Sequence, residues 1–318
     1  GGEPLLRKDD ILRLARKHQN LTFGVFTNAT LIDAATADAI AATPNLNMFI
    51  SIEGGKEETD FRRGAGVYDK CLNAMKLLRE RGVAFAFSAC YHAKNCETVA
   101  SDAYLDWLRE QGAWMGWLFK YAPIGKDADL SLVCTPRQRA WVRQQIADYC
   151  ARERYTIIDF WNMGHVATGC VAAGNGFIHI NARGDVEPCA FCHYADSNIR
   201  DESLIEALQS PFFRAFRSAQ PFTDNPLIAC PMLDHPQSLV DVCAAGGAYS
   251  THYDAPETPE ALAEKCHDAA KAWQPVAEQL YAQLDPRWQR IFAGVSRAHR
   301  LRVKCFDRPL ATKPKEER

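Results

Sequence analysis

The stretch NMFISIEGG, residues 47–55, decides the fold class together with the residues that follow it. It has the pattern of a buried strand that ends in a glycine turn. An amphipathic helix is expected from Tyr68 to Arg81, with apolar residues at helical spacing and Gly82 at its end. The run VAFAFSACYH, residues 83–92, is then a second strand. A strand, a helix and a strand in this order indicate a parallel βαβ unit.

The same alternation continues on both sides of this unit. Further strands are expected at residues 21–28 and 114–122, and further helices at residues 8–18, 33–42, 98–110 and 136–154. Residues 1–154 therefore predict one α/β domain, and such domains bind their ligands at the carboxyl ends of the parallel strands. Polar or glycine-rich stretches follow several of these strands and would form one rim.

The pattern changes after about residue 155. Residues 155–253 begin with the strand-like run TIIDFWNM and continue with a hairpin, GFIHINARGDVEP, which turns at Arg183-Gly184. This second domain contains the tightest group of cysteines. Residues 254–318 predict two helices, from Thr258 to Leu284 and from Asp285 to about His299, followed by a polar, frayed tail.

Composition and charge exclude some classes of partner. The 318 residues carry a net charge of −2, so neither nucleic acid nor an acidic membrane surface is expected as a partner. No apolar run is long enough to span a membrane. The chain has twelve cysteines and no export signal, which indicates a cytoplasmic protein whose clustered cysteines bind metal.

Four cysteines stand out by their spacing: Cys170, Cys189, Cys192 and Cys230. Cys189 and Cys192 form a C-x2-C pair, which lets two thiolates bind one centre from a tight turn. Four thiolates suit either zinc or an iron–sulfur cluster. Cys243 is the alternative to Cys230 as the fourth ligand, and His193 and His235 are weaker candidates that more often lie beside a metal site than in it.

The other cysteines predict no site. Cys71, Cys90, Cys150 and Cys266 lie within regular elements and are expected to be small buried hydrophobic residues. Cys96, Cys134 and Cys305 have no partner at a recognisable spacing. His267 lies beside Cys266 in the helix that begins after Thr258, and its position indicates packing rather than ligation.

Taken in order, these segments resemble the radical SAM superfamily, whose members use S-adenosylmethionine (SAM). GGEP at residues 1–4 is similar to the motif that binds the SAM amino group, and FTNAT at residues 26–30 is similar to the segment after the third strand. Residues 51–83 resemble the fourth-strand segment S-x-D-G followed by R-G and a helix. YAPIGK, residues 121–126, resembles the end of the sixth strand. The spacing C-x13-G-x4-C from Cys170 to Cys189 is similar to the opening of SPASM and twitch domains, which hold auxiliary 4Fe–4S clusters.

The resemblance implies a fold and a set of cofactor contacts. The fold would be a partial (β/α)6 TIM-like barrel, incomplete at its N-terminus, followed by a small Cys-rich α+β domain of the twitch or SPASM kind and C-terminal helices. By the same resemblance, the SAM ammonium would meet Gly1, Gly2 and Glu3, its carboxylate would meet Arg63, its ribose or carboxylate would meet Ser51, and its adenine would meet the backbone of Tyr121 and Ala122. A guanidinium suits paired hydrogen bonds to a carboxylate.

Two motifs of the family are missing from this sequence. The C-x3-C-x2-C motif that holds the SAM-binding cluster is absent, so we expect an N-terminally truncated chain that is inactive alone, from a parent enzyme that is active. The segment CPMLDHPQSLVDVC does not supply the ligands of a second auxiliary cluster, so one such cluster is expected. Ala190 stands where sulfatase-maturing relatives carry Asp, which argues against that activity.

The resemblance predicts a radical SAM enzyme. The parent protein would cleave SAM reductively to a 5′-deoxyadenosyl radical and modify a peptide, protein or small-molecule substrate, with the auxiliary 4Fe–4S cluster as electron conduit and a flavodoxin or ferredoxin as electron donor. Asp159, Trp161 and His165 are guesses for residues that face the substrate. The alternatives are a non-catalytic module that binds zinc or an iron–sulfur cluster, and a degenerate SAM-binding scaffold.

Overall fold

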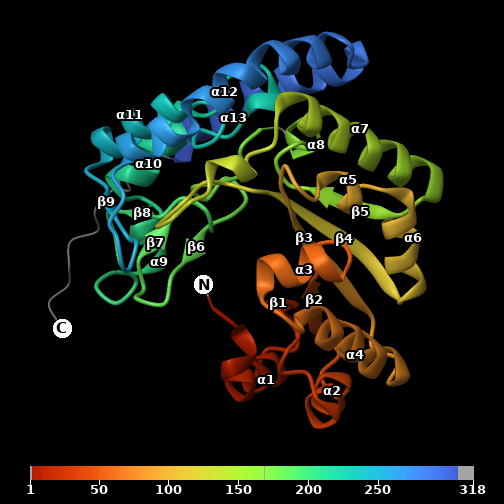
Figure 1. The fold of residues 1–318 in the computed structure, drawn as a ribbon. Helices are drawn as coiled ribbons and strands as arrows, with labels where there is room; N and C mark the ends of the chain where they lie inside the picture. The colour runs from red at the N-terminus through yellow and green to blue at the C-terminus, as the bar shows by residue number, and fades with distance from the viewer. Residues whose placement is uncertain (1, 168, 307–318) are drawn as a thin grey trace, which may run out of the picture. The chain divides into compact units, whose positions relative to one another are not determined.

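A computed structural model describes residues 2–167 and 169–306 (Figure 1). The chain forms two compact units. The first contains the residues up to Tyr121 together with Ser131–Asn162, and the second contains Ala122–Leu130 and the chain from Met163 onward. Each unit is described by itself.

The first unit is built on a five-stranded sheet in which every neighbouring pair is parallel. The strands follow one another in chain order: β1 Phe23–Thr27, β2 Leu46–Ser51, β3 Phe85–Tyr91, β4 Ala113–Lys120 and β5 Thr156–Asp159. The parallel α/β architecture predicted from the sequence is confirmed. The run TIIDFWNM, expected to open the second domain, supplies β5 of this sheet. The three domain borders expected from the sequence stay a prediction.

Helices connect these strands (Figure 1). They are η1 Pro4–Arg7, α1 Lys8–Lys17, α2 Ala34–Ala41, α3 Lys56–Arg63, α4 Val67–Glu80, α5 Cys96–Val99, α6 Asp102–Glu110 and α7 Pro136–Glu153. Side-chain caps define several starts: Asp33 caps α2, Ser101 caps α6, and Thr135 forms a capping box with Gln138 at α7. Each cap satisfies backbone N–H groups that a helix start otherwise leaves unpaired.

The two faces of the sheet pack differently. Met48 and Ile50 of β2 belong to the large core that also contains residues of α4 and α6. Phe49, between them, points to the opposite face because strand side chains alternate. There it packs with Ala86 and Met115 and stacks on Phe26, with ring centroids 4.4 Å apart.

Helix α3 was not expected from the sequence. Its segment, KEETDFRR, buries only Thr59, so it shows no apolar periodicity. The helix is held by polar contacts instead. Asp60 accepts hydrogen bonds from the backbone N–H groups of Gly66 and Tyr68, both 2.9 Å, and so ties the end of α3 to the start of α4.

The second unit contains short strand pairs and longer helices. Its elements are α8 Gly164–Ala167, β6 His179–Ile180, β7 Val186–Glu187, β8 Tyr194–Ala195, α9 Leu204–Ala207, α10 Pro211–Ala219, η3 Pro226–Ile228, α11 Pro236–Gly246, β9 Tyr249–Ser250, α12 Pro259–Ala282 and α13 Pro286–Phe306, while η2 Leu130–Leu132 joins the units. β6 pairs with β7 and β8 with β9, both antiparallel. The expected hairpin and both C-terminal helices are confirmed. The expected frayed tail falls mainly on residues 307–318, outside the described residues.

A glycine fixes the close approach of α10 and α11. A Cβ on Gly246 would lie 2.3 Å from the Cα of Phe212, so no other residue fits there without moving a helix. Phe212, Phe213 and Phe216 of α10 are buried in this unit. None of the helices in the described part of the chain is long and apolar enough to cross a bilayer.

Candidate functional site

Glu3 links the beginning of the chain to the carboxyl end of β1. One carboxylate oxygen accepts hydrogen bonds from the backbone N–H of Leu5 at 2.9 Å and the hydroxyl of Thr27 at 2.7 Å. The other accepts from the backbone N–H of Asn28 at 2.8 Å. Glu3 is also the N-cap of η1. A carboxylate has about four acceptor positions, so these three donors leave room for one more.

The glycines before Glu3 are partly described. Gly2 has a φ of 92° and nothing within 4 Å of the position of a Cβ, while Gly1 lies outside the described residues. The assignment of Gly1, Gly2 and Glu3 to the SAM ammonium stays a prediction.

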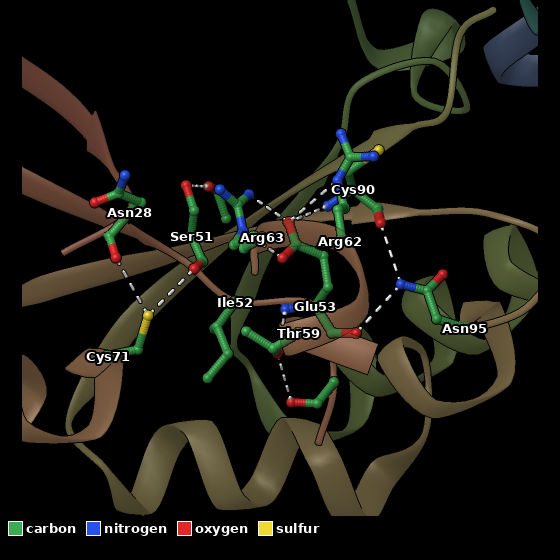
Figure 2. Close-up of polar contacts among 12 residues, drawn as sticks. Asn28, Ser51, Ile52, Glu53, Thr59, Arg62, Arg63, Cys71, Cys90 and Asn95 are labelled. Carbon is green, nitrogen blue, oxygen red and sulfur yellow. Dashed lines mark hydrogen bonds and ion pairs between the residues drawn. The ribbon is translucent and has the colours of Figure 1, made fainter. Parts of the chain in front are cut away.

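A buried carboxylate, that of Glu53, lies just beyond the end of β2 and is fully inaccessible to solvent. Figure 2 shows it facing two guanidinium groups. Arg63 donates to both carboxylate oxygens through Nε and Nη2, and Arg62 lies 3.7 Å away. One negative charge therefore faces two positive charges. Fork-shaped pairs of this kind are strong and fix geometry.

The loop after β3 closes over the same residue. The side-chain amide of Asn95 donates to the backbone carbonyls of Glu53 and Cys90, both at 3.2 Å (Figure 2). The N–H of Glu53 donates to the hydroxyl of Thr59 at 3.1 Å. The carboxyl ends of β2 and β3 are thus joined through one glutamate.

Only some of the residues predicted to contact SAM lie close together. Ser51 lies at the end of β2 with its hydroxyl 3.1 Å from that of Ser88, and Arg63 lies beside it (Figure 2). Tyr121 extends the pairing of β4, since its N–H donates to the carbonyl of Tyr91 at 2.8 Å. Ala122 belongs to the second unit.

The sequence did not single out Glu53 or Arg62. The signal for Glu53 was present, because it occupies the acidic position of the S-x-D-G pattern.

Removing the charge of Glu53 should destabilise the carboxyl edge of the first sheet. We expect Glu53→Gln to lower the free energy of unfolding by roughly 2 kcal/mol, because it leaves Arg63 with an unmatched charge, partly relieved by the solvent that reaches it. Urea unfolding would measure this. Glu57→Gln, an exposed position in the first turn of α3, is the control. Equal effects of the two substitutions would contradict a holding role for Glu53.

A second buried acid lies on the helix-covered side of the sheet. Asp159 at the end of β5 accepts from the amide of Asn162 at 2.7 Å and the hydroxyl of Tyr91 at 3.4 Å. Arg139 of α7 donates to Asn162 at 2.9 Å. Burial raises the pKa of Asp159 to about 6, although these hydrogen bonds and Arg139 counteract part of the shift.

The three residues guessed to face the substrate lie in different environments. Asp159 and Trp161 are both buried, and Trp161 packs against Phe119 and Phe160. His165, in the second unit, contacts the ring of Trp288 with centroids 6.1 Å apart. Their roles toward substrate stay predictions.

Asp159 should make stability depend on pH. Between about pH 4 and 6 the unfolded chain ionises this acid while the folded chain keeps it protonated, so folding weakens as pH rises. Two pKa units correspond to about 3 kcal/mol. The Asp159→Asn variant lacks this acid, so its stability does not fall in the same way. We therefore expect the difference in free energy of unfolding, variant minus native chain, to increase by about 3 kcal/mol from pH 4 to pH 7. Asp148→Asn, at an exposed site, is the control, and a flat profile for Asp159→Asn would refute the raised pKa of Asp159.

The cysteines of the second unit form the other candidate site. The N–H of Cys192 donates to the carbonyl of Cys189 at 3.0 Å, so the C-x2-C pair forms the expected tight turn. Burial, together with the nearby thiols of Cys230 and Cys189, raises the pKa of Cys170. Burial and the Cys230 thiol also raise the pKa of Cys189, to about 12. The four predicted thiols are therefore near one another.

The alternative ligands have other surroundings. Cys243, in α11, is buried and lies near Cys192, whose pKa it helps to raise. His193 faces the carboxylate of Glu187 at 3.4 Å. His235 precedes α11, and burial lowers its pKa. In the described part of the chain, no three His, Cys, Asp or Glu side chains are close enough together to hold a single metal ion.

The remaining cysteines show one contact that the sequence did not suggest. Cys71 and Cys266 are buried as expected, while Cys90 and Cys150 are half-buried. The thiol of Cys134 lowers the pKa of Cys96, so these two thiols are neighbours although their spacing carried no signal. The side chain of Cys305 lies outside the described residues.

Comparison with known families identifies both domains. Residues 1–94 match the radical SAM superfamily, and residues 170–231 match the SPASM iron–sulfur cluster-binding domain. The chain therefore contains a segment of the radical SAM superfamily and a segment of the SPASM family. These two families bind SAM and 4Fe–4S clusters.

Similar proteins agree with this class. The AdoMet-dependent heme synthase of Methanosarcina barkeri is 24% identical over 69% of this chain and 70% of its own length. That of Oleidesulfovibrio alaskensis is 25% identical over 70% of this chain and 64% of its own.

Two solved structures share the fold. Streptococcus suis SuiB bound to SAM has a TM-score of 0.53 and 18% identity over 65% of this chain. The enzyme anSMEcpe with bound AdoMet has a TM-score of 0.53 and 14% identity over 94% of it. The matched region spans only 52% of SuiB and 83% of anSMEcpe.

Proposed function

We propose that this chain is part of a radical SAM enzyme that cleaves SAM reductively and modifies a small-molecule or peptide substrate. The observation that carries the proposal is that Glu3 is bound to the carboxyl end of β1 while Ser51 and the Glu53–Arg63 pair lie at that of the neighbouring β2, inside the region that matches the superfamily. Parallel sheets bind ligands at this edge. SAM and a reduced cluster supply the 5′-deoxyadenosyl radical in such enzymes.

The chain's own residues orient SAM in this proposal. Glu3 keeps one acceptor position for the SAM ammonium while its other bonds hold it to β1. Arg63 has five N–H donors, of which the pair with Glu53 uses two, so the remainder can meet the SAM carboxylate. Glu53 thereby sets the direction of the Arg63 fork. The Tyr121 backbone would meet the adenine.

The four thiols of the second unit suit an auxiliary cluster. Cys170, Cys189 and Cys230 are half-buried and Cys192 is buried, and their thiols are soft donors of the kind that hold a 4Fe–4S cluster. We propose Cys230 rather than Cys243 as the fourth ligand because its thiol acts on all three others. When bound, the cluster supplies one-electron transfer. A flavodoxin or ferredoxin in the cytoplasm is the proposed electron donor.

A flat conjugated molecule is the substrate class that we favour. The sheet face opposite the helices carries Phe26, Phe49, Trp117 and Phe119, whose rings contact one another. Such rings stack well on a flat conjugated system. The curated relatives are named heme synthases, and heme is a flat macrocycle. A peptide is the alternative, since SuiB has been solved with its precursor peptide SuiA.

Iron retention tests the cluster assignment. After anaerobic reconstitution with iron and sulfide, we expect the native chain to hold a 4Fe–4S cluster and Cys170→Ala/Cys189→Ala to lose it, because half of the ligands are gone. Iron and labile sulfide analysis would measure this. Cys150→Ala is the control, since Cys150 lies in α7. Unchanged iron in the double variant, or bound zinc without sulfide in the native chain, would refute the assignment.

Product analysis tests the reaction. The protein for this test is the chain extended before Gly1 by a C-x3-C-x2-C loop and loaded with clusters. With dithionite and SAM it should yield 5′-deoxyadenosine. Arg63→Gln should raise the SAM concentration needed for half-maximal yield by at least tenfold, the equivalent of about 1.4 kcal/mol. Added tetrapyrrole or peptide should increase the yield if it is the substrate class. Absence of 5′-deoxyadenosine from a fully loaded protein would rule out the proposed activity.

A further inference from the structure

One buried carboxylate in the second unit, that of Glu187 in β7, is not explained by the proposed ligands. It is fully buried and gathers four side chains. One oxygen accepts from His179 at 2.6 Å and faces His193 at 3.4 Å. The other accepts from the amide of Asn181 at 3.0 Å and from the hydroxyl of Thr251. These partners come from β6, the hairpin turn, the approach to β8 and the end of β9.

The position of this carboxylate relates it to the cysteine turn. Glu187 stands two residues before Cys189, and His193 directly follows Cys192. The contact between Glu187 and His193 therefore closes the base of the Cys189–Cys192 turn, whose tip is held by the hydrogen bond from the Cys192 N–H to the Cys189 carbonyl. Thr251 and His179 then anchor that base to both strand pairs of the unit.

We propose that Glu187 is a positioning residue for the Cys189–Cys192 turn: its contacts with His193, His179 and Thr251 fix the backbone that carries these two thiols. The inference rests on the proposed function only in that the turn carries two of the proposed cluster ligands. Glu187 acts through the backbone of the turn.

Two substitutions test whether Glu187 holds the Cys189–Cys192 turn. Glu187→Gln removes the charge and two of the acceptor contacts but keeps the size of the side chain. Thr251→Val keeps the charge and removes one donor. Glu264→Gln, at an exposed position in α12, is the matched control for loss of a negative charge.

The first measurement uses the full chain without metal. Alkylation of Cys189 and Cys192 by iodoacetamide, followed by mass spectrometry, should be several-fold faster in both Glu187→Gln and Thr251→Val than in the native chain and the control. The rate at Cys266, away from the turn, should not change. Equal rates at Cys189 and Cys192 in all variants would overturn the positioning role.

The second measurement uses the cluster-loaded chain. The electron paramagnetic resonance spectrum of the reduced cluster should change in both Glu187→Gln and Thr251→Val, because the turn that carries two of its ligands is displaced, and should stay native in Glu264→Gln. An unchanged spectrum in Glu187→Gln, or loss of iron without faster alkylation, would overturn the positioning role. If the native chain bound no iron, the auxiliary cluster itself would be refuted, and the alkylation rates would still decide whether Glu187 holds the turn.

Discussion

The burial of one carboxylate constrains the whole carboxyl edge of the first sheet. A charged group without access to water must be paired and hydrogen-bonded, or it destabilises the fold. The Glu53 carboxylate meets this requirement with a guanidinium from α3 and the backbone N–H of Cys90 in β3, and Asn95 from the loop after β3 donates to the Glu53 backbone carbonyl. Satisfying it brings α3, β2 and β3 into a single arrangement, which is also the arrangement that presents Ser51 and Arg63 together. The stability of this edge and its capacity to orient a ligand therefore have the same origin.

The second unit uses a buried carboxylate in a different chemical setting. Arg62 and Arg63 face Glu53, whereas imidazole, amide and hydroxyl groups surround Glu187. The first carboxylate is matched by an excess of positive charge, which suits an edge that meets an anionic group. The second is surrounded by hydrogen-bond donors beside the Cys189–Cys192 turn. The first environment therefore suits the proposed binding of a carboxylate, and the second suits the fixing of a turn.

Much of the architecture could be predicted from the sequence because its signals are local. Buried strands such as residues 47–53 appear as apolar runs, and α4 appears through its apolar spacing. Helix α3 could not be found in this way, since only Thr59 is buried and its supports are polar. The partners of Glu53 and Glu187 lie up to 64 residues away, as Thr251 does from Glu187, and no periodicity encodes such pairs. Motif resemblance located Ser51 and Arg63 but did not reveal what Arg63 binds within the protein.

The segment Ala122–Leu130 belongs to the second unit, although the residues before and after it belong to the first. The chain therefore leaves the first unit after β4 and returns to it for α7 and β5. A gene cut at any single position would separate neither unit cleanly: a cut after β4 would deprive the sheet of its last strand, and a cut after β5 would leave part of the second unit attached to the first. Neither unit is a continuous segment of the chain, so any single fragment that holds all of one unit also holds part of the other.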